Sequence, residues 1–160
     1  MKDIYQVLES LEIAFQKHEH PAAFTIEQAK QHWKNIDGAH CKNLFLRDYK
    51  GNRHFLVIIE GSKNFPIKTF QEIVGQRLSF ASDQRLAKYL GLTAGSVSPF
   101  GLINDETKHV ELFIDSDLKR YGKLNFHPNI NTATLTISFA YFIKFLDWCG
   151  NKYSFFDMKA

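Results

Sequence analysis

Residues 42–59 read Lys42-Asn43-Leu44-Phe45-Leu46-Arg47-Asp48-Tyr49-Lys50-Gly51-Asn52-Arg53-His54-Phe55-Leu56-Val57-Ile58-Ile59. The first part, to Arg47, predicts a β-strand, and the polar residues 48–52 predict a turn. The run from Arg53 to Ile59 is almost continuously apolar, which is typical of a strand buried on both faces. The stretch therefore predicts a hairpin at the centre of a sheet that is covered on both sides.

Helices and further strands are predicted around this hairpin from apolar spacing and capping residues. The expected helices are Ile4 to about His18, Ile26–Trp33 after a capping box at Thr25 and Gln28, Phe70–Gly75, Ser82–Leu90 and Phe139–Trp148, the last closing the chain. The expected strands are Phe100–Ile103, Val110–Ile114 and Ala133–Ile137. Strands grouped in hairpins between helices indicate an α+β fold, and the length predicts one domain over residues 1–160.

The composition is that of a globular protein with an aromatic core. Hydrophobic residues make up 44% of the chain, and fifteen of its 160 residues are phenylalanine. The net charge of +3 permits an RNA or phosphate partner without requiring one. No run reaches the about 20 apolar residues of a membrane span and no signal peptide is evident, so we expect a cytoplasmic protein.

Cysteine and histidine usage argues against a metal centre. Only Cys41 and Cys149 are present, which makes a disulfide framework or a thiolate zinc site improbable. His18 and His20 are two residues apart at a predicted helix end, so their rings would not share a face. We therefore expect no metal.

A loop rich in glycine and serine separates a predicted helix from a predicted strand. It reads Gly91-Leu92-Thr93-Ala94-Gly95-Ser96-Val97-Ser98-Pro99-Phe100-Gly101-Leu102. Its small side chains let the backbone approach a ligand, so Gly95-x-x-x-Pro99 is a candidate cradle for an oxyanion or a phosphate. The pattern alone favours a plain helix-to-strand turn, because short motifs of glycine and proline are common.

Three polar residues outside this loop are further candidates. Lys42 has the charge to neutralise a phosphate, and Asn43 has an amide that can fix a carbonyl or hydroxyl group. His127 lies in the rigid loop Phe126-His127-Pro128-Asn129 and is suited to carry a proton, donate a hydrogen bond or form a wall. Taken singly, a surface lysine and a structural histidine explain these residues as well.

Four motifs occur together in a fixed order: residues 41–48, 77–81, 91–105 and 126–129. In these motifs the chain resembles the YbaK/prolyl-tRNA synthetase-associated domain family of trans-editing deacylases. It is most similar to the free-standing branch that removes alanine from mischarged tRNA(Pro). The resemblance implies an α+β fold with a mixed, mostly antiparallel, barrel-like sheet surrounded by helices.

The resemblance also implies roles for individual residues. Lys42 would engage the phosphate or ribose of the tRNA end, Asn43 would lie beside the substrate amino group or ribose, and His127 would help to set which side chain fits. Catalysis would fall to Lys42 and to the backbone N–H groups of Gly95 and Ser96, which would hold the oxyanion. Val97, Ser98, Pro99 and Gly101 would complete the substrate-binding loop.

The chemistry implied by the resemblance needs no cofactor. An aminoacyl ester is already activated, so water or a ribose hydroxyl can be the nucleophile, and Cys41 is expected to belong to the core. The implied partner is the acceptor end of a mischarged tRNA, with prolyl-tRNA synthetase as a further partner and a monomer as the favoured state. Two alternatives remain: a cysteinyl-tRNA(Pro) deacylase, and a non-catalytic tRNA- or synthetase-binding or regulatory module of the same fold.

Overall fold

The computed structural model describes residues 3–22 and 36–157. Its centre is an eight-stranded sheet with the strand order β1-β7-β6-β2-β3-β5-β8, and β4 pairs with β2 outside this path. The strands are β1 (Gln16–Glu19), β2 (Ala39–Asp48), β3 (His54–Glu60), β4 (Leu78–Phe80), β5 (Val110–Asp115), β6 (Lys123–Phe126), β7 (Ala133–Ser138) and β8 (Tyr153–Phe156). The predicted helix Ile26–Trp33 and its capping box lie outside the described residues.

The sheet is mixed, as expected. In the described part of the chain four strand pairs are antiparallel (β1–β7, β2–β3, β2–β4 and β6–β7) and three are parallel (β2–β6, β3–β5 and β5–β8). The predicted hairpin is confirmed, because β2 and β3 pair from Cys41–Glu60 to Arg47–His54. The α+β class and the mostly antiparallel sheet are therefore confirmed.

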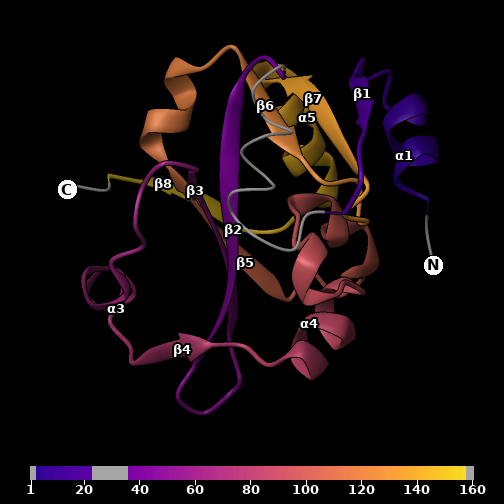
Figure 1. Cartoon of the computed structure of the whole chain (residues 1–160). Helices are drawn as coiled ribbons and strands as arrows, with labels where there is room; N and C mark the ends of the chain where they lie inside the picture. Colours follow the sequence, from indigo (N-terminus) through magenta and orange to yellow (C-terminus); the bar gives the residue numbers. More distant parts are fainter. Residues whose placement is uncertain (1–2, 23–35, 158–160) are drawn as a thin grey trace.

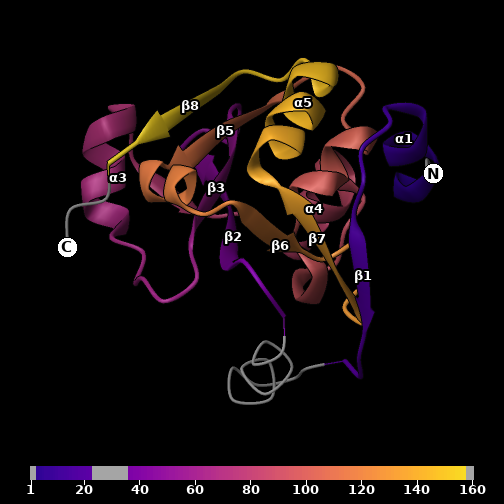
Figure 2. The same ribbon diagram turned by 90° about the horizontal axis from the view of Figure 1, so that it is seen from above.

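Helices cover both faces of the sheet (Figures 1 and 2). They are α1 (Ile4–Ser10), α3 (Ile67–Val74), α4 (Asp83–Leu90) and α5 (Phe139–Cys149), with 3-10 turns η1 (Ala94–Ser96), η2 (Pro99–Asn104) and η3 (Ser116–Arg120). The helix predicted from Ser82 to Leu90 is confirmed with its caps: the Ser82 hydroxyl accepts from the Arg85 N–H, and Gly91 adopts the left-handed conformation with φ of 66°. None of the helices within the described residues is long and apolar enough to cross a bilayer.

Alternate residues of β2 enter two separate cores. Phe45 packs in the larger core with Phe100, Phe126 and side chains of α5. Leu46 packs in a smaller core beneath α3, with Phe70 among its members. Successive side chains of a strand point to opposite faces, so each face of β2 has its own set of neighbours.

Two predicted elements are wrong. The first helix ends at Ser10 rather than near His18, because the chain turns at Glu12, which has a left-handed φ of 57°, and then pairs as β1 with β7. The strand predicted at Phe100–Ile103 is the 3-10 helix η2, which is capped by the Ser98 hydroxyl and begins at Pro99. These caps favour a helical turn although the residues are apolar.

The C-terminal helix is confirmed but does not close the chain. It begins after its Ser138 cap and ends at Gly150, which has a φ of 79°. The chain then continues as β8, which pairs in parallel with β5. The strands β1, β4, β6 and β8 were not predicted.

Candidate functional site

A small cavity lies where β2, β6 and β7 meet, and its volume is about 30 Å³. It is lined by His40, Cys41, Asn43, Asn125, Phe126, His127 and Thr134. Two of the residues singled out in the sequence, Asn43 and His127, are thus brought together although they are far apart along the chain.

An interruption in strand pairing forms this site. On its side away from β3, β2 pairs with β6 only at Ala39 and His40, and with β4 only from Leu46 to Asp48. Among the described residues, no strand pairs with residues 41–44 on this side. A ligand can therefore meet the backbone and side chains of β2 here without displacing a neighbouring strand.

Asn43 has a polar atom that is unsatisfied among the described residues. Its Oδ1 atom is buried and has no hydrogen-bond partner among the residues that the structure describes. Asn125, in the same cavity, is fully engaged: its Nδ2 donates to the carbonyls of Asp37 and Ala39 at 2.7 and 3.4 Å, and its Oδ1 accepts from the Thr136 hydroxyl. A buried acceptor without a donor is costly, so the Asn43 amide is suited to a ligand that brings one.

The His127 ring has a defined tautomer. Its Nδ1 lies 2.9 Å from the Ala133 carbonyl oxygen, which can only accept, so Nδ1 carries the hydrogen. Burial lowers the pKa of His127 and the nearby His20 lowers it further, although the bond to Ala133 opposes both effects. The ring is therefore neutral at pH 7, and its Nε2 is a proton acceptor.

Cys41 is not an activated nucleophile. Burial raises the pKa of its thiol far above the ordinary value, with smaller contributions from Glu60 and Asp115. Its side chain is half-buried and packs against the larger core. A thiol that stays protonated is a poor nucleophile, so Cys41 forms part of the cavity wall.

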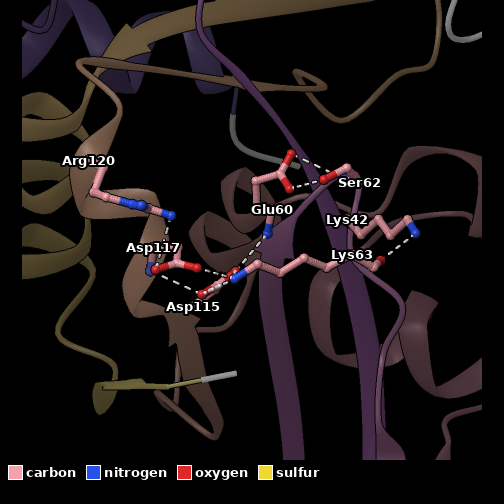
Figure 3. Close-up of polar contacts among 7 residues, drawn as sticks. All are labelled: Lys42, Glu60, Ser62, Lys63, Asp115, Asp117 and Arg120. Carbon is pink, nitrogen blue, oxygen red and sulfur yellow. Dashed lines mark hydrogen bonds and ion pairs between the residues drawn. The ribbon is translucent and has the colours of Figure 1, made fainter. Parts of the chain in front are cut away.

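Lys42 does not enter the cavity. It leaves β2 on the opposite face from Cys41 and Asn43, and its Nζ donates to the backbone carbonyl of Lys63 at 2.6 Å (Figure 3). The ammonium is thus held beside the loop that follows β3. Any contact of Lys42 with a ligand is made outside the cavity.

The loop that carries Gly95 packs against the loop that carries His127. A Cβ atom added to Gly95 would lie 3.3 Å from the Asn131 amide nitrogen. The Asn129 amide also donates to the Phe100 carbonyl, at 3.4 Å. The residues of the two sequence motifs are therefore neighbours in space.

The expected pair of oxyanion donors is not available in this conformation. The Ser96 N–H donates to the Thr93 carbonyl at 3.0 Å, because residues 94–96 form the 3-10 turn η1. The Ser96 side chain is buried, and its hydroxyl bonds to Thr93. Of the two expected donors, only the Gly95 N–H stays a candidate.

Most of the remaining loop residues are buried and support the conformation of the loop. Ser98 is fully buried, and its hydroxyl accepts from the Phe100 N–H at 3.1 Å. Pro99 and Gly101 are buried in η2, where a Cβ on Gly101 would lie 2.6 Å from a Leu92 methyl group. The expected substrate contact by Ser98, Pro99 and Gly101 stays a prediction, and their burial would limit it to the backbone. Val97 packs partly against the larger core.

Residues 20–145 match the family model of the aminoacyl-tRNA editing domain. The chain belongs to the aminoacyl-tRNA editing domain family. The resemblance drawn from the four sequence motifs is therefore confirmed.

Named relatives agree with this assignment. The editing domain is 40% identical over 153 residues to the prolyl-tRNA editing protein ProX of Acetoanaerobium sticklandii, covering 94% of this chain and 93% of that protein. It is 31% identical to the mouse prolyl-tRNA synthetase associated domain-containing protein 1, covering 93% and 90% of the two chains. A solved structure described as a candidate trans-editing enzyme for prolyl-tRNA synthetase shares the fold, with a TM-score of 0.73, 20% identity and 99% coverage of both chains.

Several residues of the editing domain's cavity were not indicated by the sequence. They are His40, Asn125 and Thr134. Asn125 stands between the buried Leu124 and Phe126, and a polar residue within an apolar strand was the available signal. Thr134 alternates with apolar residues in β7 and is 3% exposed, so its polar face meets the cavity rather than solvent.

No cluster of three or more histidine, cysteine or carboxylate side chains with the spacing of a metal site occurs in residues 3–22 and 36–157.

Proposed function

We propose that this editing domain is a trans-acting deacylase that hydrolyses mischarged tRNA(Pro), and that alanine is the amino acid it removes. The observation that carries the proposal is the buried Asn43 Oδ1, which lacks a donor among the described residues and lies in a cavity of about 30 Å³. The α-ammonium group of an aminoacyl ester or the ribose hydroxyl beside the ester would supply that donor. The tRNA(Pro) assignment is supported by the similarity to the prolyl-tRNA editing protein ProX.

The size of the cavity favours a small side chain. A space of about 30 Å³ is small and favours a compact group such as the methyl group of alanine. The larger ring of proline is expected to fit less well, which would disfavour the correctly charged tRNA. Cysteine adds a sulfur atom to the methyl group, and one extra heavy atom in such a pocket changes kcat/KM by roughly 10- to 200-fold.

The reaction needs a water molecule, a proton acceptor and a donor for the oxyanion. Water attacks the ester carbonyl carbon and gives up a proton, the bond from that carbon to the ribose oxygen breaks, and that oxygen takes up a proton, so the free amino acid and the tRNA with its ribose hydroxyl leave. The unprotonated Nε2 of His127 is suited to orient the water or the substrate ammonium group. The Gly95 N–H is the proposed donor to the carbonyl oxygen.

Lys42 is assigned to the tRNA rather than to the amino acid. Its ammonium lies on the face of β2 opposite the cavity. Among the described residues, no strand pairs with residues 41–44 on the side of β2 away from β3, so this edge connects the two faces. The acceptor end would cross this open edge, with the aminoacyl group in the cavity and a terminal phosphate at Lys42. A lysine acts on phosphate as a point charge, so its main effect is on binding.

The proposal is tested by deacylation of alanyl-, cysteinyl-, seryl- and prolyl-tRNA(Pro). The wild type, Lys42→Ala and the control Lys144→Ala, an exposed lysine on α5, are compared on each substrate. We expect rapid loss of alanine only, weakened in Lys42→Ala and unchanged in Lys144→Ala. Faster loss of cysteine would identify the domain as a cysteinyl-tRNA(Pro) deacylase. Salt-dependent tRNA binding without turnover would identify it as a non-catalytic binding module.

We also propose that the domain acts as a cytoplasmic monomer and that a synthetase can assist it. The net charge of +3 gives only modest attraction to tRNA, which leaves room for help from prolyl-tRNA synthetase. Adding that synthetase to the deacylation assay should then lower the KM for alanyl-tRNA(Pro). An unchanged KM would remove the synthetase from the proposal.

A further inference from the structure

We propose that Lys63 is a positioning residue that holds the ammonium group of Lys42 in place, and that Asp115 and Asp117 anchor Lys63 for this purpose. The inference rests on the proposed function only in assigning Lys42 to the tRNA. The contacts that carry it are drawn in Figure 3, where the Lys63 side chain runs towards Asp115 and Asp117 while the Nζ of Lys42, from β2, meets the Lys63 carbonyl.

The backbone of this loop is fixed directly after β3. The Gly61 N–H donates to the His40 carbonyl, and a Cβ on Gly61 would lie 2.6 Å from that oxygen. The Lys63 N–H donates to the Glu60 carbonyl at 3.1 Å, which closes a turn. The Lys63 carbonyl is thereby presented to Lys42, whose Nζ lies 2.6 Å away.

The Lys63 side chain ties this turn to the end of β5. Its Nζ lies 2.8 Å from an Asp115 carboxylate oxygen and 2.6 Å from an Asp117 oxygen. Asp115 is fully buried, and it also accepts from the N–H groups of Glu60 and Asp117 at 3.1 and 3.0 Å. A charge pair with one buried partner and several hydrogen bonds has little freedom to move.

The Lys63 ammonium and the Asp117 carboxylate stay charged at neutral pH. Burial alone would lower the pKa of Lys63, but its hydrogen bonds to Asp115 and Asp117 raise the pKa above the ordinary value. The hydrogen bond from Lys63 lowers the pKa of Asp117. A permanently charged tie of this kind is suited to positioning and not to proton transfer.

Lys63 therefore contributes two groups with different tasks. Its ammonium is fixed to the end of β5, and its carbonyl, presented by a backbone turn that this anchor helps to hold, orients the ammonium of Lys42. Without the anchor the Lys42 group would be free to turn away from a phosphate at the edge of β2. A misplacement of about 1 Å at a reacting or binding group costs up to about 100-fold in rate.

The first test measures Lys42 directly and does not depend on activity. The full chain is treated with an amine-acetylating reagent, and acetylation of Lys42 is followed by mass spectrometry, with the exposed Lys144 as the internal standard. In Lys63→Met we expect Lys42 to react about 3- to 10-fold faster, the equivalent of one net hydrogen bond, and Lys63→Arg should restore the slow rate. An unchanged Lys42 rate in folded Lys63→Met would overturn the inference.

The second test is a double-mutant cycle on alanyl-tRNA(Pro) deacylation. Lys63→Met should lower kcat/KM on the order of 10-fold, mainly through KM, and should have no further effect when Lys42→Met is already present. Full additivity of the two changes would contradict the inference. A wild-type protein without deacylase activity would contradict the proposed function, while the acetylation rates would still decide the role of Lys63.

Matched variants separate positioning from folding. Arg120→Met removes a more exposed cation that lies 3.4 Å from the same Asp117, so it should leave both readouts unchanged. If Lys63→Met does not fold because Asp115 loses its cation, Asp117→Asn takes its place, since it removes one anchor and leaves the buried pair. That variant should shift Lys42 acetylation in the same direction by a smaller factor, and no shift would overturn the inference.

Discussion

Two asparagines of the same cavity should respond in opposite ways to the same substitution. The Asn43 Oδ1 has no partner among the described residues, so Asn43→Ala removes no hydrogen bond that this oxygen makes within them. We expect it to change the free energy of unfolding by less than about 1 kcal/mol. If that oxygen accepts from the charged α-ammonium group, the variant loses about 1.5–3 kcal/mol of transition-state binding, or roughly 10- to 150-fold in kcat/KM.

Asn125→Ala is the matched control. Its amide bonds to Asp37, Ala39 and Thr136, and all three partners would lose that hydrogen bond. We expect a loss of about 2–4 kcal/mol in the free energy of unfolding, which lowers Tm by roughly 4–16 °C for a chain of this length.

The assay combines thermal unfolding with initial rates of alanyl-tRNA(Pro) deacylation, measured below the lower Tm. The expected pattern is a stable but slow Asn43→Ala and an unstable Asn125→Ala. An Asn43→Ala variant with kcat/KM within about twofold of the wild type would refute the assignment of Asn43 to the substrate. Equal losses of Tm in both variants would refute the claim that its amide is unused in the free protein.

Three further outcomes are expected. Gly95→Ala should slow deacylation because the new methyl group displaces the Asn131 amide 3.3 Å away, whereas Gly122→Ala, with nothing within 4 Å, should match the wild type in the same rate assay. Gly101→Ala should lose about 1–3 kcal/mol in chemical unfolding, since its Cβ would overlap a leucine methyl group at 2.6 Å, and an unchanged midpoint would contradict this packing. Burial lowers the pKa of His54 to about 4. The contribution of the neutral ring to the free energy of unfolding is therefore complete above pH 6.5 and is lost as the pH falls towards 4. The free energy of unfolding should fall by about 3 kcal/mol between pH 6.5 and pH 4 because of His54. A His54→Gln variant whose free energy of unfolding falls equally steeply with pH would contradict this assignment.

Local signals made part of the fold predictable. The hairpin of β2 and β3 follows from a long apolar run beside a polar turn, and α4 follows from its Ser82 cap and Gly91 stop. These features act within a few residues, so the sequence around them determines the outcome.

Other elements depend on distant parts of the chain. The residues of β1 are Gln16-Lys17-His18-Glu19, which have no apolar alternation, and they become a strand only because β7 pairs with them. Residues 100–103 are apolar enough for a strand, but the Ser98 cap and Pro99 favour the 3-10 turn. Tertiary pairing in one case and capping in the other overrode the hydrophobic pattern.

The candidate site was predictable in its residues more than in their arrangement. Asn43 and His127 do share a cavity, and the Gly95 loop does lie beside the His127 loop. The direction of the Ser96 N–H depends on the turn η1, which the small residues of the loop do not specify. Alternation along β2 places Lys42 on the other face from Asn43, and the neighbour that holds it is set by the loop after β3.

The strand order also bears on how the chain reaches its folded state. β1 lies at one edge of the sheet and pairs with β7, while β8 lies at the other edge and pairs with β5. During synthesis, β1 leaves the ribosome long before its partner β7 exists, and β5 waits for β8. Such distant pairings are slow to form, so the nascent chain exposes unpaired strand edges until β7 and β8 have been made. Chaperone demand during translation should therefore be set by the two edge strands rather than by the central hairpin.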